Sequence, residues 1–164
     1  MIRHHWEMHM EPRLKNQYKH VPDSYQALRA LEQSTRKDDL LTHEIQELVR
    51  IRASQINGCG FCLDMHVNDA KAAGETDERL HSIAGWREAP WFTEAERAAL
   101  ALTEAMTRLP DSSSPVPDDI WDNAAKHFDD QALMLLVVTI ATINTWNRIN
   151  VTTRQVAGSH RRAS

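Results

Sequence analysis

Residues 47–75, ELVRIRASQINGCGFCLDMHVNDAKAAGE, hold two helical patterns that meet at the turn Asn57-Gly58. Apolar side chains recur at intervals of three and four residues before this turn, which predicts a helix that begins near Thr42. The second helix is predicted to begin at Gly58-Cys59 and to stop at Gly74, a residue suited to a left-handed C-terminal cap. The Cys-x-x-Cys pair therefore lies in the first turn of this second helix.

The same spacing continues on both sides of this segment, and the alternation typical of β-strands is absent almost throughout, so the sequence predicts an all-α fold. Residues 93–96, TEAE, form a capping-box pattern that predicts a helix start. The other expected helix starts are Pro22-Asp23 with Asp23 or Ser24 as the cap, Thr76, Pro117-Asp118 and Asp129-Asp130. The last of these helices is expected to run to about Asn150.

A chain of 164 residues fits one domain and can bury a core without structural disulfides or metals. We expect a helical domain over 11–155, a flexible N-terminal extension over 1–10 and a flexible C-terminal tail over 156–164. The formal net charge of −4 gives no electrostatic reason to expect nucleic acid or an acidic membrane surface as a partner.

The longest apolar run, ALMLLVVTIATI over 132–143, is shorter than the roughly 20 residues of a membrane span and is interpreted as a buried helix. The first ten residues, MIRHHWEMHM, lack the pattern of a signal peptide. We therefore expect a cytoplasmic protein, and in that compartment a Cys-x-x-Cys motif is typical of redox or metal-binding sites.

Cys59 and Cys62 are the two cysteines of the chain, and their spacing at a helix start allows them to bridge each other. A thiolate is the reactive species, so a device must remove the proton of the thiol. Two are at hand: the positive end of the helix, and His66, one turn after Cys62 on the same face. An oxidised Cys62 sulfenic acid would have a resolving thiol beside it.

Glu47 is the candidate carboxylate that would charge and orient His66, because an antiparallel pair of helices brings the two residues to one level. Glu44, one turn earlier, is the spare candidate. Asn144, Asn147 and Arg148 are unusual in an apolar helix, and either a subunit interface or the wall of an active site would explain them.

Other interpretations stay open at this point. The two cysteines could be an unreactive buried pair, or they could bind zinc together with His66, although structural zinc usually takes four ligands. His66 alone could be a core histidine with satisfied hydrogen bonds, and Glu47 a solvated or ion-paired surface residue.

The pattern of Glu47, Cys59, Cys62 and His66, E-x11-C-x-x-C-x3-H, resembles the AhpD-like alkylhydroperoxidases of the carboxymuconolactone decarboxylase superfamily. The similarity continues in HSIAGWREAPWFTEAERAALALTEAMT over 81–107 and in INTWNRIN over 143–150. It covers roughly residues 11–150.

The resemblance implies an AhpD-like multi-helix orthogonal bundle that assembles as trimers or hexamers, with the Cys-x-x-Cys motif at the N-terminus of a central helix. It implies Cys62 as the peroxide-attacking thiol, Cys59 as the more exposed resolving thiol, and Glu47 with His66 as the proton carriers. It implies no cofactor, and an external thiol or a disulfide reductase as electron donor. Phe61 departs from the family, whose best-studied members carry a histidine there.

The resemblance therefore predicts a thiol-dependent peroxidase that reduces hydroperoxides. The physical argument from the helix end instead favours Cys59 as the readily ionised thiol. The alternatives are a protein-disulfide reductase or redox relay with weak peroxidase activity, a decarboxylase or isomerase on the same scaffold, and a metal-stabilised or oligomeric binding protein without catalysis. No nucleic acid and no membrane are expected as partners.

Overall fold

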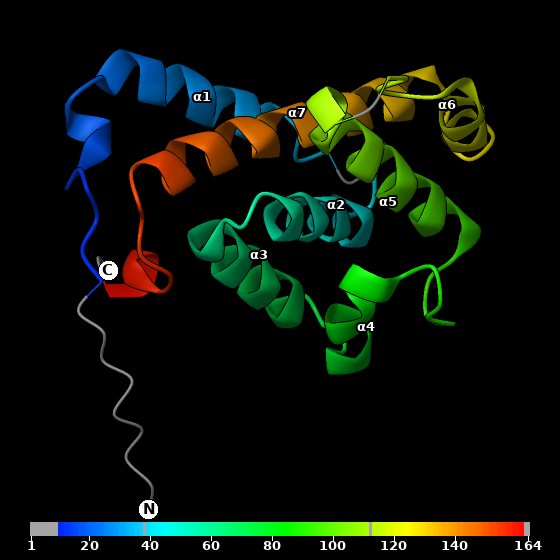
Figure 1. Ribbon diagram of the computed structural model, residues 1–164, viewed down its shortest axis with the longest axis horizontal. Helices are drawn as coiled ribbons and strands as arrows, with labels where there is room; N and C mark the ends of the chain where they lie inside the picture. Colours follow the sequence, from blue (N-terminus) through cyan, green and yellow to red (C-terminus); the bar gives the residue numbers. More distant parts are fainter. Residues whose placement is uncertain (1–9, 38, 112, 163–164) are drawn as a thin grey trace, which may run out of the picture.

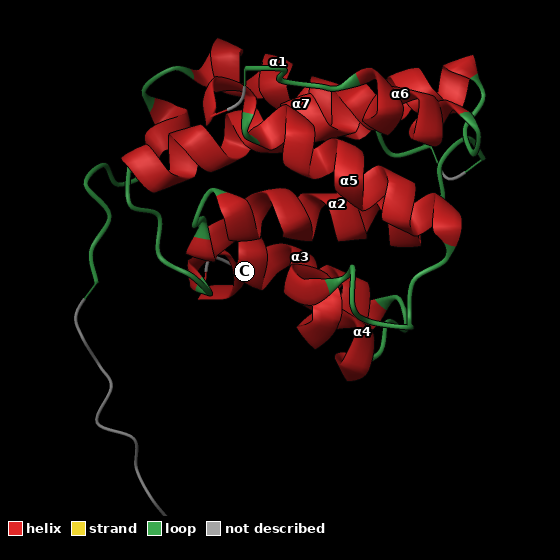
Figure 2. Cartoon of the chain, turned by 45° about the vertical axis from the view of Figure 1, so that its right-hand side comes forward, coloured by secondary structure: helices red, strands yellow, loops and turns green. Residues whose placement is uncertain are grey.

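The computed structural model describes residues 10–37, 39–111 and 113–162, and in these residues it contains helices and no β-strand (Figures 1 and 2). The all-α prediction is thus confirmed. The seven α-helices of the described residues are α1 (Pro22–Ser34), α2 (His43–Ile56), α3 (Gly60–Ala72), α4 (Asp77–Ser82), α5 (Glu94–Thr107), α6 (Asp118–Ala125) and α7 (Asp130–Thr152).

Most helices begin where the sequence predicts. Thr42, Thr93 and Asp129 each cap a helix by accepting a backbone N–H with the side-chain oxygen, and Thr93 completes a capping box with Glu96. α3 ends at the predicted glycine: Gly74 has a φ of 100°, and the N–H of Glu75 reaches back to Ala70 O at 3.0 Å, which closes a Schellman motif.

The predicted cap of α1 is wrong. Asp23 and Ser24 both lie inside the helix, and the N-cap is Val21, whose side chain makes no capping hydrogen bond. Pro22 is the first helical residue, and because proline has a fixed φ and no N–H to satisfy, it can start the helix without a polar cap.

Helix α2 is the centre of the fold, packed against α3 on one side and against α5 and α7 on the other (Figure 1). Residues 46–51 are all buried as a consequence, polar ones included. Its apolar residues serve two core clusters. Val49 joins Leu41, Ala98, Ala99, Leu102, Leu136 and Ile140, and Leu48 and Ile51 join Ala70, Leu80, Ile83, Trp86, Phe92 and Leu100.

Helix α7 spans 23 residues and is longer than the apolar run 132–143 within it. By length and composition the whole helix could cross a membrane. The short length of the run 132–143 therefore does not by itself argue against a membrane span. Half of its most apolar window is buried inside the molecule, and it packs on α1, α2, α3, α5 and α6. That placement is the one expected of a core helix in a helical bundle, and it agrees with the interpretation as a buried helix.

The two ends of the described chain lie on the same side of the molecule (Figure 1). Arg13 N donates to Thr153 O at 2.8 Å, and Gln155 Nε2 donates to Leu14 O at 3.2 Å. The C-terminal residues continue into a short 3-10 helix, Ser159–Arg162, that contacts α3 through His160 and Arg161. The predicted extension 1–10 lies outside the described residues except for Met10, and the predicted domain boundaries stay predictions.

Candidate active site

The turn between α2 and α3 places the cysteine pair. Gly58 has a φ of 65°, a conformation that glycine adopts without strain, and it lets the chain reverse within two residues of α2. Cys59 is the N-cap of α3: its N–H returns to Ser54 O at 3.0 Å, and its Sγ accepts the N–H of Cys62 at 3.3 Å. The predicted position of the motif at a helix start is confirmed.

The two sulfurs are joined as a disulfide, with 5.4 Å between the Cα atoms. Both residues are buried, Cys59 with 2% and Cys62 with 1% of its surface exposed, in a small cluster with Ala53 and Ile143. Exposure therefore does not separate the two cysteines. The expectation that Cys59 is the more exposed one stays a prediction, because Ala53 of α2 and Ile143 of α7 pack with both cysteines.

Glu47 and His66 meet as the antiparallel arrangement of α2 and α3 predicts. Oε2 of Glu47 lies 2.8 Å from Nδ1 of His66, and the side chains are 1% and 2% exposed. A carboxylate at Nδ1 holds the imidazole in one orientation and leaves Nε2 as the second functional nitrogen. The structure thus brings together two of the four predicted site residues by a direct hydrogen bond.

Glu47 is also tied to a buried arginine that the sequence analysis did not consider. Nη1 of Arg50 donates to Oε1 of Glu47 at 2.8 Å, and Arg50 is completely buried. Nη2 of Arg50 donates to Thr35 Oγ1 at 3.1 Å and to Gln46 Oε1 at 3.2 Å. The charge at position 50 interrupts the apolar pattern of residues 48–51, and this was the signal that could have pointed to it.

The pKa of Glu47 lies far below its usual value. Burial alone would raise it, but the hydrogen bond and charge of His66, followed by the charges of Arg50 and Arg36, lower the pKa to about 2. The carboxylate is therefore ionised at neutral pH although it is buried, because each of its oxygens faces a donor.

Among the described residues, no hydrogen bond joins His66 to Cys59 or Cys62. Nδ1 of His66 is bound to Glu47, although the spacing of four residues places His66 and Cys62 on one face of the helix. The polar side-chain atom at Cys62 Sγ is instead Nδ2 of Asn150, at 3.4 Å. Asn150 was not singled out from the sequence, although asparagines at 144, 147 and 150 form a visible stripe along an apolar helix.

The other two asparagines of the stripe hold the turn before the cysteines. Asn57 Nδ2 donates to Oδ1 of both Asn144 and Asn147 at 2.9 Å, and Asn147 Nδ2 donates to Ser54 Oγ at 3.0 Å. Both residues are buried inside the chain. Of the two explanations that the sequence left open, these contacts favour the wall of the site.

Phe61, which replaces the family's histidine, is partly buried and packs on the cysteine cluster. Its ring meets the ring of His160 edge to face, with 5.5 Å between the centroids. The neighbouring Arg161 pairs with Asp64 of α3 at 3.1 Å. The C-terminal segment therefore lies against the start of α3.

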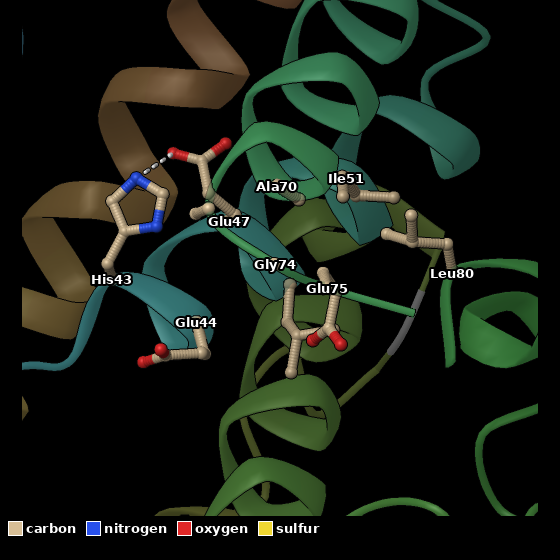
Figure 3. A pocket seen from close by; sticks show the side chains of 10 residues that line it. His43, Glu44, Glu47, Ile51, Ala70, Gly74, Glu75 and Leu80 are labelled. Atoms are coloured by element: carbon tan, nitrogen blue, oxygen red, sulfur yellow. Dashed lines mark ion pairs between the residues drawn. The ribbon is translucent and has the colours of Figure 1, made fainter. Parts of the chain in front are cut away.

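A pocket of about 90 Å³ opens beside the carboxylate of Glu47, where His43 faces it at 3.9 Å (Figure 3). Glu44, the spare candidate, lines this pocket and is exposed, and within the described residues no hydrogen bond or ion pair joins it to His66. Neither cysteine lines the pocket. The pocket therefore reaches the Glu47–His66 pair from the side of Glu47.

Glu47, His66 and the exposed Asp69 have ligand atoms within 4.8 Å of one another, close enough to hold a metal ion. Two features disfavour a cation there: Oε1 of Glu47 is paired with Arg50, and Arg36 lies 3.9 Å from the same oxygen. The zinc interpretation from the sequence used different atoms, the two sulfurs, and in this form of the protein the sulfurs are bonded to each other.

Comparison with known proteins gives consistent matches. The family model described as "Carboxymuconolactone decarboxylase family" matches residues 22–105. The uncharacterized protein YdfG of Bacillus subtilis (strain 168) is 37% identical over 134 residues, which cover 82% of this chain and 89% of YdfG.

Solved structures share the fold. The crystal structure of an Agrobacterium tumefaciens protein of unknown function, suggested to be the antioxidant defence protein AhpD, is 37% identical with a TM-score of 0.83 and covers 90% of this chain and 98% of its own. The apo debrominase Bmp8 is 20% identical with a TM-score of 0.74 over 88% of this chain and 76% of its own, and at that identity it supports the fold alone.

Proposed function

Since this chain belongs to the carboxymuconolactone decarboxylase family, we propose that it is a thiol-dependent peroxidase that reduces hydroperoxides by cycling Cys59 and Cys62 between dithiol and disulfide. The observation that carries the proposal is the hydrogen bond between the ionised Glu47 and His66, which lies one helical turn after Cys62 of the Cys59–Cys62 disulfide. The similar Agrobacterium structure, with its suggested AhpD assignment, supports the same class of activity.

In the first half of the cycle, the Cys62 thiolate attacks the terminal oxygen of the hydroperoxide. A sulfur–oxygen bond forms, the oxygen–oxygen bond breaks, and Cys62 becomes a sulfenic acid while the alkoxide leaves. His66 takes the thiol proton and returns it to the alkoxide, which departs as an alcohol. Because His66 makes no hydrogen bond to the sulfur, the proton passes through a water molecule, and the negative Glu47 stabilises the protonated imidazole.

In the second half, the Cys59 sulfur attacks the sulfenic acid, the disulfide forms, and water is released. The separation of 5.4 Å between the Cα atoms allows this bond with the helix intact. An external thiol or a disulfide reductase then supplies two electrons and two protons to restore the dithiol. No cofactor is required in this cycle.

The burial of the sulfurs supports a small substrate. With at most 2% of either cysteine exposed, the sulfurs are less accessible to the backbone of a substrate protein than to a small hydroperoxide. The remaining expectations, a cytoplasmic location and assembly into a homo-oligomer of three or six chains, belong to this proposal as well.

The test is a single-turnover reaction of the reduced protein with an alkyl hydroperoxide. We expect the loss of both thiols of each chain, no reaction in Cys62→Ser, and in Cys59→Ser a sulfenic acid that a trapping reagent captures. Glu47→Gln should slow the loss of thiols. Glu44→Gln is its matched control, since the exposed Glu44 lies outside the Glu47–His66 pair. An unchanged thiol content after peroxide treatment would refute the proposal.

A protein-disulfide reductase is the second candidate, and Phe61 is the observation that favours it. An apolar ring stands where the best-studied members of the family carry a proton-transferring histidine. The rates of the reduced protein with an alkyl hydroperoxide and with a disulfide substrate separate the two candidates. A faster reaction with the disulfide would favour the reductase.

A further inference from the structure

We propose that the side-chain amide of Asn150 is a catalytic hydrogen-bond donor to Cys62, which stabilises its thiolate, and that Gln17 fixes the direction of this amide. The inference rests on the proposed function for its catalytic meaning, because Cys62 is taken as the nucleophile. The contact itself is a feature of the chain whichever reaction the dithiol performs.

Asn150 reaches the cysteine from the far end of α7. Its Nδ2 lies 3.4 Å from Cys62 Sγ across 88 positions of the chain, and the residue is 5% exposed. Asn150 lies three residues after Asn147, so both side chains share one face of α7. Asn147 holds the turn before the cysteines, whereas Asn150 reaches the sulfur.

The chemistry of the acceptor explains why an amide is placed there. A disulfide sulfur is a weak acceptor, but a thiolate carries a full charge, and hydrogen bonds to charged groups are roughly twice as strong as neutral ones. The amide therefore stabilises the reduced, ionised cysteine more than the disulfide. The same donor would face a sulfenate formed on Cys62.

This donor also affects which of the two cysteines ionises more readily. Cys59 Sγ accepts the N–H of Cys62 at the positive end of α3, an arrangement that favours ionisation of Cys59. His66 makes no hydrogen bond to Cys62 that would offset this advantage. The amide of Asn150 supplies Cys62 with a donor of its own, which lets the second cysteine act as the nucleophile.

Gln17 determines which end of the amide faces the sulfur. Its Nε2 donates to Oδ1 of Asn150 at 2.9 Å, and its Oε1 accepts from the Thr153 hydroxyl at 2.6 Å. With Oδ1 of Asn150 occupied by a donor, Nδ2 is left to point at Cys62. The orientation is set where residues 13–17 pack against residues 150–155.

The experiment measures the ultraviolet absorbance of the thiolate against pH in the reduced Cys59→Ser protein, where Cys62 is the remaining thiol. We expect Asn150→Ala to lower the ionisation constant of Cys62 by roughly ten- to a hundredfold. Thr139→Val is the matched control, since it removes a buried polar group of the same helix whose hydroxyl donates to Leu135 O and not to sulfur. It should leave the titration of Cys62 close to that of the parent.

Gln17→Glu is a second variant for the same titration, and a loss of packing alone would not explain a change in the ionisation constant of Cys62 in this variant. A carboxylate at this position cannot donate to Oδ1, so it would take Nδ2 of Asn150 for itself and turn Oδ1 toward the sulfur, again lowering the ionisation constant. Gln155→Glu adds the same charge beside Thr153 without facing Asn150 and controls for charge.

Folded Asn150→Ala and Gln17→Glu proteins with the parental titration would overturn the inference. The thiolate titration uses no peroxide, so its outcome is independent of the proposed function. If the titration shifts as expected but peroxide consumes no thiol, the peroxidase proposal fails and the role of Asn150 stands.

Discussion

Nδ1 of His66 and Oε2 of Glu47 lie 2.8 Å apart in the interior, and the other oxygen of the same carboxylate lies 2.8 Å from Nη1 of Arg50. One carboxylate thus neutralises a buried guanidinium and orients a buried imidazole. Both tasks depend on its charge, since a neutral group could satisfy the hydrogen bonds on one side alone. Stability and proton transfer are therefore coupled at Glu47.

Glu47→Gln should impair both properties. The substitution leaves Arg50 with Glu32, 3.5 Å away, as its nearest carboxylate, and the loss of a partner from a buried ion pair costs about 3 kcal/mol. We also expect the rate of thiol loss with hydroperoxide to fall by roughly 10²-fold, because the imidazolium is no longer stabilised. Urea unfolding and single-turnover kinetics measure the two effects.

Glu44→Gln, an exposed change one turn earlier, should alter neither property by a comparable amount. If both variants behaved alike, the pairing of Glu47 with His66 and Arg50 would contribute neither to the rate of thiol loss nor to the free energy of unfolding. A loss of rate in Glu47→Gln without a loss of stability would show that Glu32 suffices for Arg50.

The stability of the fold should fall in acid through the same carboxylate. The pKa of Glu47 is lowered from 4.5 to about 2 in the folded protein, so its contribution is fully present above pH 4.5 and disappears as the pH falls toward 2. The contribution is about 3 kcal/mol. Urea unfolding at a series of pH values should show a shallower acid decline in Glu47→Gln than in the parent; parallel curves would contradict this assignment.

The pairing of Glu47 with His66 could be predicted from the sequence because regular helices and a short turn fix relative positions. Once Asn57-Gly58 folds α2 against α3, residues at matching distances from the turn must meet. The helix caps at Thr42, Thr93 and Asp129 could be predicted for a similar reason, since a cap is a local interaction.

The rest of the site depends on contacts between distant segments, for which local periodicity carries no signal. Asn150 meets Cys62 because α7 crosses the start of α3, and Gln17 joins them because residues 13–17 pack against residues 150–155. The burial of Arg50 follows from the central place of α2, where every face of the helix is covered. A polar residue within an apolar helix indicates that such a buried contact exists, but it does not indicate which residue is the partner.

The capping box of α5 offers a test of the fold apart from the site. Thr93 Oγ1 accepts the N–H of Glu96 at 3.3 Å, and Glu96 Oε2 accepts the N–H of Thr93 at 2.7 Å. Thr93→Ala should lower the free energy of unfolding by about 1 kcal/mol and leave the peroxide rate unchanged. Thr145→Ala, which removes an exposed hydroxyl within α7, is the control and should change stability less. Equal losses would argue against the capping role of Thr93.

Phe61 directly precedes Cys62 in the Cys-x-x-Cys motif. Phe61 cannot transfer a proton, and its ring lies on the cysteine cluster and against His160. Phe61→His should therefore raise the rate with an alkyl hydroperoxide by about tenfold, a modest part of what a well-placed acid or base can contribute. Phe61→Leu removes the ring without adding an imidazole and should not accelerate the reaction. The rate gain in Phe61→His should also depend on pH near the ionisation of histidine, which a packing effect would not do. Equal rates in the two variants would mean that Glu47 and His66 already carry all of the proton transfer, so that the ring between the cysteines only packs the site.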